Sequence, residues 1–410
     1  MGKLVSAIAC AFLAASPGAA QTIQVRTIEA QTGRPIGGAI VVLLDSVGRR
    51  LKQGLTDDFG RISLVAPTAG TYRLKADRIG HPGVLGVPFS SAETRAIILE
   101  MPAERYELPE LVVSETSACG RGESDETAVL WGEIRKALTA SEITSSSEAV
   151  LLQVRRFLRR RTLSGALRSD STTQTFSTRL APFVTPDPGS LIANGYIQSG
   201  DGSYRFFGPD AAFLGSLGFL ETHCFRIVRD DRNRPELIGL GFEPTKGRHV
   251  PEIKGTMWVD RVSAELRTLE YQYVNAPPSV QSRDLRGRID FQRMANGLWI
   301  IRDWYIRLPD RVYVQRRVGA RLPIGERGDT IVGFIDDGGT ARPVGDASVL
   351  VPGPEVRTAR TSVILRDVRL SLVSSAGAPV EGALVAVAEL DSTLRSGVDG
   401  RVLVRGIPTT

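Results

Sequence analysis

The sequence contains few of the residues on which most catalytic sites depend. Its 410 residues include three histidines and three cysteines. His81, His223 and His249 have no glutamate or histidine partner at a metal-ligand spacing such as HxxE or HExxH. A GxSxG nucleophile elbow is missing, and GLGFEP at residues 239–244 lacks the third glycine of a dinucleotide-binding loop. We therefore predict no catalytic residue, no cofactor and no metal site, and a protein that is not an enzyme.

Long hydrophobic runs are also absent. The N-terminal run, residues 4–15, is too short to span a bilayer. It follows Lys3 and precedes small residues at the spacing of a cleavage site, which is the pattern of a secretory signal peptide over residues 1–20. We expect a bacterial protein whose mature chain starts at Gln21, has no transmembrane segment, and is periplasmic, associated with the outer membrane, or secreted.

Export leaves two cysteines, Cys119 and Cys224, in the mature chain. In an oxidising compartment, two remaining cysteines predict a disulfide. Such a bond would join the linker after the first domain to the sheet of the middle domain. It would contribute roughly 4–5 kcal/mol of stability in the chain-entropy model. The alternative is two buried free thiols.

The charge of the chain indicates no particular partner. The formal net charge is +6 and is spread along the sequence, with few lysines and many arginines. The densest basic cluster, RRFLRRR at residues 155–161, predicts a solvated basic face. Because an exported protein rarely meets nucleic acid, we expect no nucleic-acid partner. An acidic lipid head group is the functional alternative for this cluster.

Residues 22–102 alternate apolar and polar residues with the two-residue period of β-strands. The turn sequences TGRP, DDFG, PTAG and GHPG separate these strands, and AIVVLLD at residues 39–45 has the composition of a more buried strand. About seven short strands without a helix predict a small transthyretin-like or Ig-like β-sandwich.

Residues 22–102 resemble the carboxypeptidase regulatory-like domain family, a transthyretin-like β-sandwich with a carbohydrate-binding-like fold. The family module accompanies many different proteins, so the resemblance implies a fold and a binding role for protein or glycan, and implies no reaction. The residues that carry the resemblance are Gly33, Pro35, Ile36, Gly38, Ala39, Val41, Thr56, Asp58, Gly60, Arg61, Leu64, Gly70, Tyr72, Leu74 and Gly80.

Part of this pattern returns at residues 366–410. Nothing there matches GTYRLKADRIG of residues 70–80, so we predict an incomplete second sandwich with an open sheet edge. Either the chain is truncated at Thr410 or a partner supplies the missing strand. We expect this copy to be mobile, joined through a linker at 336–365. The repeated residues are Gly377, Pro379, Val380, Gly382, Ala383, Val385, Asp399, Gly400, Arg401 and Leu403.

Residues 123–335 are predicted to form an α+β middle domain that follows a polar linker at 103–122. Trp131, Ile134 and Leu138 recur at helical spacing, so an opening helix should cover a sheet. The following segment, from residue 150, fits a helix or a strand, and we favour a strand leading into a polar stretch. A short helix should then place Cys224 beside the sheet.

The clearest strand patterns lie later in the middle domain. Residues 255–275 predict two strands joined by a turn, and residues 287–309 predict a hairpin that turns at Asn296 and Gly297. These hairpins favour a curved antiparallel sheet covered on one face, with Glu270 outward and solvated. Residues 250–310 also resemble hairpins of the outer-membrane lipoprotein carrier family, in which a curved half-barrel encloses acyl chains beneath helices.

Three functions follow from these patterns. The first is a non-catalytic cell-envelope protein that binds another envelope protein or a glycan through its sandwich domains. The second is a lipid or lipoprotein carrier built on the middle domain, and the third is an unrecognised hydrolase with a carboxylate pair. A filled middle core would favour the first function. An apolar cavity between sheet and helix would favour the second, and carboxylates converging with His249 the third.

Overall fold

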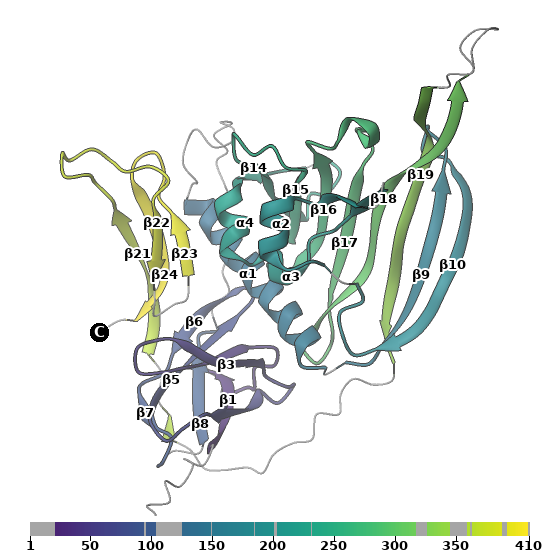
Figure 1. The fold of residues 1–410 in the computed structure, drawn as a ribbon. Helices are drawn as coiled ribbons and strands as arrows, with labels where there is room; N and C mark the ends of the chain where they lie inside the picture. The colour runs from purple at the N-terminus through teal and green to yellow at the C-terminus, as the bar shows by residue number, and fades with distance from the viewer. Residues whose placement is uncertain are drawn as a thin grey trace, which may run out of the picture.

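The computed structural model describes residues 21–93, 96–103, 125–148, 150–183, 185–200, 203–230, 232–316, 326–344, 359–360, 363–387 and 392–408. The fold is mainly β with several antiparallel sheets, which confirms the predicted class. Figure 1 shows a β region formed by residues 21–103, a large sheet with helices on one face, and a C-terminal group of strands beside them. The finer assignment to a transthyretin-like family stays a prediction.

Two sheets enclose the core of residues 21–103, which we call the first β region. One sheet has the order β20-β8-β1-β4, and the other contains the run β6-β5-β2-β3, with β7 also pairing β5. Apolar side chains from both sheets form one buried cluster that includes Leu43, Leu74 and Leu99. The strands are β1 (Gln21–Glu29), β2 (Ile40–Leu44), β3 (Arg50–Leu55), β4 (Arg61–Ala66), β5 (Thr71–Arg78), β6 (His81–Leu85), β7 (Phe89–Ser90), β8 (Ala96–Met101) and β20 (Ala359–Arg360).

Strand β2 is buried on both faces. Val41 and Leu43 belong to the core between the two sheets. Ile40, Val42 and Leu44 instead belong to a second apolar cluster, which includes residues of the helix α1. A continuous apolar run is typical of a strand covered on both sides, and it explains the sequence AIVVLLD. A layer that the strands of the first β region do not supply therefore packs on the second face of β2.

That layer is helix α1 (Asp125–Ser146), which lies between the first β region and the large sheet (Figure 1). Trp131, Ile134 and Leu138 are buried, as their spacing predicts. Burial extends around the helix to Leu130 and Ala140, because α1 contacts strands on both sides. Because buried residues of α1 and of β2 belong to the same apolar cluster as the large sheet, one core joins the two regions.

The large sheet has nine antiparallel strands in the order β10-β9-β19-β18-β17-β16-β15-β14-β13. Both predicted hairpins are present in it, as β15–β16 and β17–β18. The predicted strand from residue 150 is present as β9. The strands are β9 (Leu152–Arg161), β10 (Leu167–Thr178), β13 (His223–Val228), β14 (Leu237–Pro244), β15 (Glu252–Asp260), β16 (Leu266–Val274), β17 (Arg286–Arg293), β18 (Trp299–Arg316) and β19 (Glu326–Pro343).

The short helices α2, α3 and α4 lie with α1 on one face of this sheet (Figure 1). The predicted short helix before Cys224 is present as two, α3 and α4, and Cys224 follows on β13. Residues Asp210 and Ser216 cap these helices by accepting backbone N–H groups. The elements are α2 (Pro188–Asn194), α3 (Ala211–Leu214), α4 (Leu217–Thr222), the 3-10 helix η1 (Pro278–Val280) and the hairpin β11 (Ile197–Gly200) to β12 (Ser203–Phe206).

The C-terminal strands repeat the hydrogen bonds of the first β region. The amide of Gly38 donates to Thr56 over 2.9 Å, and the amide of Gly382 donates to Ser396 over 2.9 Å. Gly382 has a φ of 70°, the same value as Gly38. The strands of this C-terminal copy are β21 (Val363–Ser371), β22 (Leu384–Val387), β23 (Ser392–Arg395) and β24 (Arg401–Pro408).

Two features differ from the expected domain boundaries. The expected linker at 336–365 begins inside β19, because residues 336–343 pair with β9 in the large sheet. At the other end of that range, β20 pairs with β8, and Val363 and Ile364 of β21 pair with β6. The polar stretch after β9 also forms a strand, β10, whose exposed polar residues suit an edge of a sheet.

Some predictions fall on residues outside the described ranges. These are the signal peptide at 1–20, almost all of the linker at 103–122, and Cys119. The disulfide between Cys119 and Cys224 therefore stays a prediction. Among the described residues, no helix has both the length and the apolar character needed to cross a membrane.

Candidate functional site

A cleft of about 250 Å³ lies between α1 and the face of the first β region that α1 covers. Its apolar floor is formed by Ile40, Val42 and Leu44 of β2. Residues of α3 and the start of α4, including Ala212 and Leu217, close another side. The cleft therefore takes its walls from segments far apart in the sequence.

Charged and polar side chains surround this apolar floor. On β5, Lys75 and Asp77 are two residues apart, so strand geometry directs both toward α1. On α1, Arg135, Thr139 and Glu142 recur at helical spacing and form one stripe that faces the strands. The remaining polar residues of the lining are Arg50, Gln53 and Lys136.

Lys75 and Asp77 form an ion pair of 2.9 Å with side chains only 13% and 17% exposed. Burial lowers the pKa of Lys75, and the nearby Arg135 and Lys136 lower it further, whereas Asp77 acts to raise it. Burial acts to raise the pKa of Asp77, but the surrounding cations outweigh it and the pKa is lowered. Asp77 is therefore ionised and attracts three cations.

The arginines of the cleft also repel one another. Burial lowers the pKa of Arg135, and the nearby Arg50 adds to this effect while Asp77 opposes it. Burial likewise lowers the pKa of Arg50, which Glu142 and Asp77 oppose. For Glu142, burial raises the pKa and the nearby Asp210 adds to the shift, whereas Arg50 opposes it. Arg50 therefore interacts with carboxylates from two sides of the cleft, Asp77 of β5 and Glu142 of α1.

Buried contacts fix α1 against the first β region and so set the width of the cleft. Glu133 accepts the amide of Gly80 over 2.6 Å and pairs with Lys136 over 2.8 Å. Lys136 also donates to the carbonyl oxygens of Arg78 and His81, over 3.1 and 2.8 Å. These contacts use a charged side chain to satisfy strand-end carbonyl groups, which stabilises the interface.

A close backbone contact also joins the first β region to the large sheet. Gly38 and Gly297 have φ values of 70° and 79°, which only glycine adopts at low cost. A Cβ atom on Gly38 would lie 2.9 Å from the Cα of Gly297. The turn at Gly297 was predicted from the sequence, but its contact with a turn 259 residues away was not.

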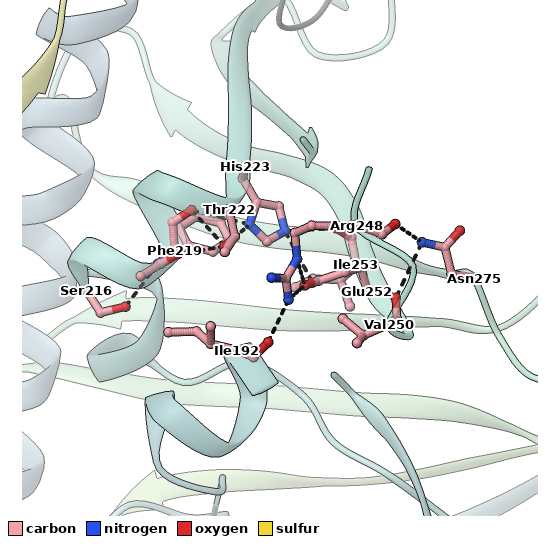
Figure 2. A network of polar contacts seen from close by, with 11 residues as sticks. Ile192, Ser216, Phe219, Thr222, His223, Arg248, Val250, Glu252, Ile253 and Asn275 are labelled. Atoms are coloured by element: carbon pink, nitrogen blue, oxygen red, sulfur yellow. Dashed lines mark hydrogen bonds and ion pairs between the residues drawn. The ribbon is translucent and has the colours of Figure 1, made fainter. Parts of the chain in front are cut away.

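Figure 2 shows a second polar cluster, centred on His223 of β13. The Nε2 atom of His223 lies 3.2 Å from the carbonyl oxygen of Ile253, and Nδ1 lies 3.1 Å from the Thr222 hydroxyl. His223 is 1% exposed. Burial lowers its pKa to about 4, so the ring is neutral at neutral pH. This histidine is a structural residue that connects α4 to β15.

Glu252 lies beside His223 in the same cluster (Figure 2). Its Oε1 atom accepts from Arg248 over 2.6 Å, and Oε2 is 3.6 Å from the Nε2 atom of His223. Burial raises the pKa of Glu252, and Arg248 opposes this shift. Because Glu252 is only 2% exposed, a substrate could not reach it without a rearrangement of the sheet.

Glu270, which was expected to be solvated, lies instead at the centre of a charged cluster on the opposite face of the sheet. It accepts from Arg234 over 2.9 and 3.0 Å, from Arg288 over 2.9 Å and from the Trp258 indole over 3.1 Å. Burial acts to raise its pKa, but the bonds to the arginines outweigh it and the pKa is lowered. A carboxylate held in its ionised form is a poor proton donor, so Glu270 does not suit general acid catalysis.

The basic cluster at residues 155–161 also differs from its prediction. Because residues alternate along β9, its arginines divide between the two faces of the sheet. Four of them pair with aspartates of β10, β18 and β19, at distances of 2.6 to 2.9 Å. These ion pairs neutralise the charge that nucleic acid or an acidic head group would require. The pairs are Arg156–Asp337, Arg159–Asp170, Arg160–Asp310 and Arg161–Asp336.

The three histidines occupy separate places. His81 is buried at the start of β6, His223 is buried in the large sheet, and His249 is exposed in the loop before β15. Within the described ranges, no three histidine, cysteine, aspartate or glutamate residues are grouped so that they could hold a metal ion. The cleft beside α1 is the candidate ligand site, and the sequence analysis did not single out any of its charged residues.

Comparisons with known proteins do not assign the chain to a family. No protein-family model matches it, and no curated protein matches it. The resemblances to carboxypeptidase regulatory-like domains and to lipoprotein carriers therefore stay predictions.

Proposed function

We propose that the protein is a non-catalytic, exported binding protein of the cell envelope, and that its ligand binds in the cleft beside α1. One observation carries the proposal: a single cavity of about 250 Å³ combines an apolar floor with converging charged groups. Ligand sites typically combine apolar walls with a few placed polar groups, although most are somewhat larger. The resemblance of residues 22–102 to carboxypeptidase regulatory-like modules adds support for a protein or glycan ligand.

The packing of the middle domain supports this function over that of a lipid carrier. Aromatic rings fill the space between the helices and the large sheet. The ring centroid of Phe219 lies 5.6 Å from that of Phe213 and 5.3 Å from that of Phe242. The ring centroids of Trp131 and Phe225 are 5.4 Å apart. An acyl chain could enter this space only if these rings moved, which would disrupt a close-packed core.

Native mass spectrometry of the purified protein, after incubation with an envelope extract, tests the proposal. Thr139→Trp should fill the cleft, because Thr139 lies on the α1 stripe that faces the strands. Thr175→Trp is the matched control, since Thr175 is exposed on the edge strand β10. We expect a bound glycan or peptide on the wild type and on Thr175→Trp, and none on Thr139→Trp.

Three results would contradict the proposal. A lipid bound equally to all three proteins would support the carrier function. A bound molecule that ignores Thr139→Trp, while circular dichroism shows an intact fold, would place the ligand site elsewhere. If no molecule from the extract binds to the wild type, the proposed role of the cleft fails as well.

A further inference from the structure

We infer that the ligand of this cleft is an uncharged sugar residue, which lies with its C–H face on β2 and its hydroxyl groups toward the polar side chains on either side. This inference rests on the proposed function and adds the chemical class of the ligand. It also names two neutral side chains that should bind the hydroxyl groups, Gln53 and Thr139.

The floor of the cleft is a narrow apolar strip with polar groups on both sides. In the sheet, Val42 of β2 pairs with Gln53 of β3 on one side and with Lys75 of β5 on the other. Ile40 of β2 pairs with Asp77 in the same way. Neighbouring strands lie about 4.8 Å apart, so β3 and β5 are separated by roughly 10 Å across the strip. A sugar ring has a matching arrangement, with an apolar C–H face and hydroxyl groups around its edge.

The charged side chains of the cleft favour an uncharged ligand. Among the described residues, the four basic side chains of the lining are matched by four carboxylates within it or beside it. A charged ligand would add an uncompensated charge next to the ion pair of Lys75 and Asp77, whose side chains are only 13% and 17% exposed. The basic residues are Arg50, Lys75, Arg135 and Lys136, and the carboxylates are those of Asp77, Glu133, Glu142 and Asp210.

Two neutral side chains of the lining are suited to binding hydroxyl groups. Gln53 accepts from Arg50 over 2.8 Å through its Oε1 atom, so its amide nitrogen is directed away from that bond and can donate to a ligand. Thr139 of α1 lies in the lining and has a hydroxyl group that can both donate and accept. The hydroxyl groups of a sugar also do both, so they match a lining of mixed donors and acceptors.

The walls of the cleft fit a peptide strand less well. Extended peptides commonly bind by adding a strand to a free sheet edge. Strand β2 has no such edge, because β3 and β5 pair with it on both sides. A ligand on this floor must therefore be recognised by side chains. The volume of about 250 Å³ is below the range typical of drug-sized ligands, so we expect the cleft to hold one sugar residue.

Saturation-transfer difference NMR and calorimetry test the ligand class with five probes. Glucose, galactose and N-acetylglucosamine are uncharged, whereas glucuronate is anionic and glucosamine is cationic. We expect at least one uncharged sugar to bind, with an affinity that does not depend on ionic strength. Its C–H protons should receive saturation from protein methyl groups, because Ile40, Val42 and Leu44 form the floor. The charged analogues should bind at least about ten times more weakly than their uncharged counterparts.

Two substitutions of similar size remove the hydrogen bonds to the sugar. Gln53→Met and Thr139→Val should each weaken binding of the sugar about three- to tenfold, the usual loss for one neutral hydrogen bond. Gln174→Met and Thr175→Val are the matched controls on the exposed edge strand β10, and they should leave the affinity unchanged. Circular dichroism checks that each variant keeps its fold.

The outcomes separate this inference from the proposed function. If none of the three uncharged sugars binds, or if a charged analogue binds more tightly than its uncharged counterpart, the inference is wrong. Affinities of Gln53→Met and Thr139→Val that equal those of the controls also overturn it. In each of these cases the proposed function stands if Thr139→Trp still abolishes binding of the molecule from the envelope extract. If that molecule binds Thr139→Trp as it binds the wild type, the proposed function itself fails.

Discussion

The first β region and the C-terminal copy form the same turns but have very different cores. The amide of Thr27 donates to Gly60 over 2.7 Å, and the amide of Leu372 donates to Gly400 over the same distance. In the first region two sheets enclose a cluster that includes Ile23, Leu43, Leu74 and Leu99. In the described part of the C-terminal copy, Val402 and Val404 are buried, with partly buried neighbours around them. Turn residues thus set the local hydrogen bonds, whereas burial depends on what covers the strands.

The same comparison shows which parts of the molecule can bind a ligand. In the first region β5 pairs with one side of β2 and supplies Lys75 and Asp77 to the cleft. The C-terminal copy repeats the segments around β1 to β4 and has no sequence counterpart of residues 70–80. Among the described residues, these charges belong to the first region. Under the proposed function, the first region forms the ligand site with α1.

The largest effect is expected from the helix that the first region and the large sheet share. Trp131 is 6% exposed, and its ring lies 5.4 Å from that of Phe225. Trp131→Ala should cost about 3–5 kcal/mol, the usual loss for a buried aromatic residue. The first region and the large sheet should lose stability together, in one calorimetric transition.

Val262→Ala, at a 77% exposed turn position, is the control and should leave the melting temperature unchanged. An unchanged transition in Trp131→Ala would show that the two regions do not share a core.

Acidification should destabilise the large sheet through His223 and leave the C-terminal copy unaffected. The folded protein holds the pKa of His223 at about 4, below the ordinary value of 6.5, because the ring is buried. Between pH 4 and pH 6.5, His223 therefore binds a proton in the unfolded chain but not in the folded chain. Stability is complete above pH 6.5 and is lost as the pH falls toward 4, by up to about 3 kcal/mol.

The measurement is urea unfolding at pH 7 and pH 4.5 for the wild type and for His223→Gln. The variant should lose less stability on acidification, because it lacks the histidine that gains a proton on unfolding. Carboxylates distant from His223 titrate equally in both proteins, whereas Glu252, 3.6 Å away, is the one whose titration the substitution also changes. The change should affect the transition of the large sheet and leave hydrogen exchange in the C-terminal copy unaltered. If the pH dependence of the variant equals that of the wild type, His223 does not carry this effect.

Equivalent glycines offer a direct comparison of the two copies. Gly60 and Gly400 have φ values of 72° and 69°, and an added Cβ would clash with the carbonyl oxygens of Thr27 and Leu372. Alanine in this conformation costs about 1–3 kcal/mol. Gly60→Ala should reduce the free energy of global unfolding by that amount and so lower the main melting temperature. Gly400→Ala should leave the main transition in place and increase hydrogen exchange at Leu372 and Gly382. Equal effects on the main transition would show that the C-terminal copy unfolds with the rest.

The sequence predicts those elements whose residues repeat at a regular spacing. The periodicity of Trp131, Ile134 and Leu138 identified the buried side of α1, and the turn at Asn296 and Gly297 identified a hairpin. The strand β10 was missed because an exposed edge strand has no apolar alternation. The clue to a second cover was the unbroken apolar run of β2, which is typical of a strand buried on both faces.

The cleft could not be found from spacing along the chain. Its cations come from β3, β5 and α1, and no local pattern relates Arg50 to Arg135. Glu270 was placed on the correct face, but its arginine partners come from other segments, so its ionised state followed only from the structure. In both cases the missing information was the pairing of distant segments, which short-range periodicity does not contain.

The smallest effect is expected at a position where the two copies differ strongly in burial. Ile40 and Leu384 occupy equivalent places after Gly38 and Gly382, but Ile40 is 4% exposed and Leu384 is 46% exposed. Leu384 lies at the edge of a small cavity of about 20 Å³ that it shares with Trp131 and Phe225. Leu384→Ala should change the free energy of unfolding by no more than about 0.5 kcal/mol, since half-exposed positions contribute little. Ile40→Ala should cost about 2–5 kcal/mol, because it leaves a cavity beneath α1. Urea unfolding of both variants measures the contrast, and a loss in Leu384→Ala as large as that in Ile40→Ala would show that the C-terminal copy is part of the shared core.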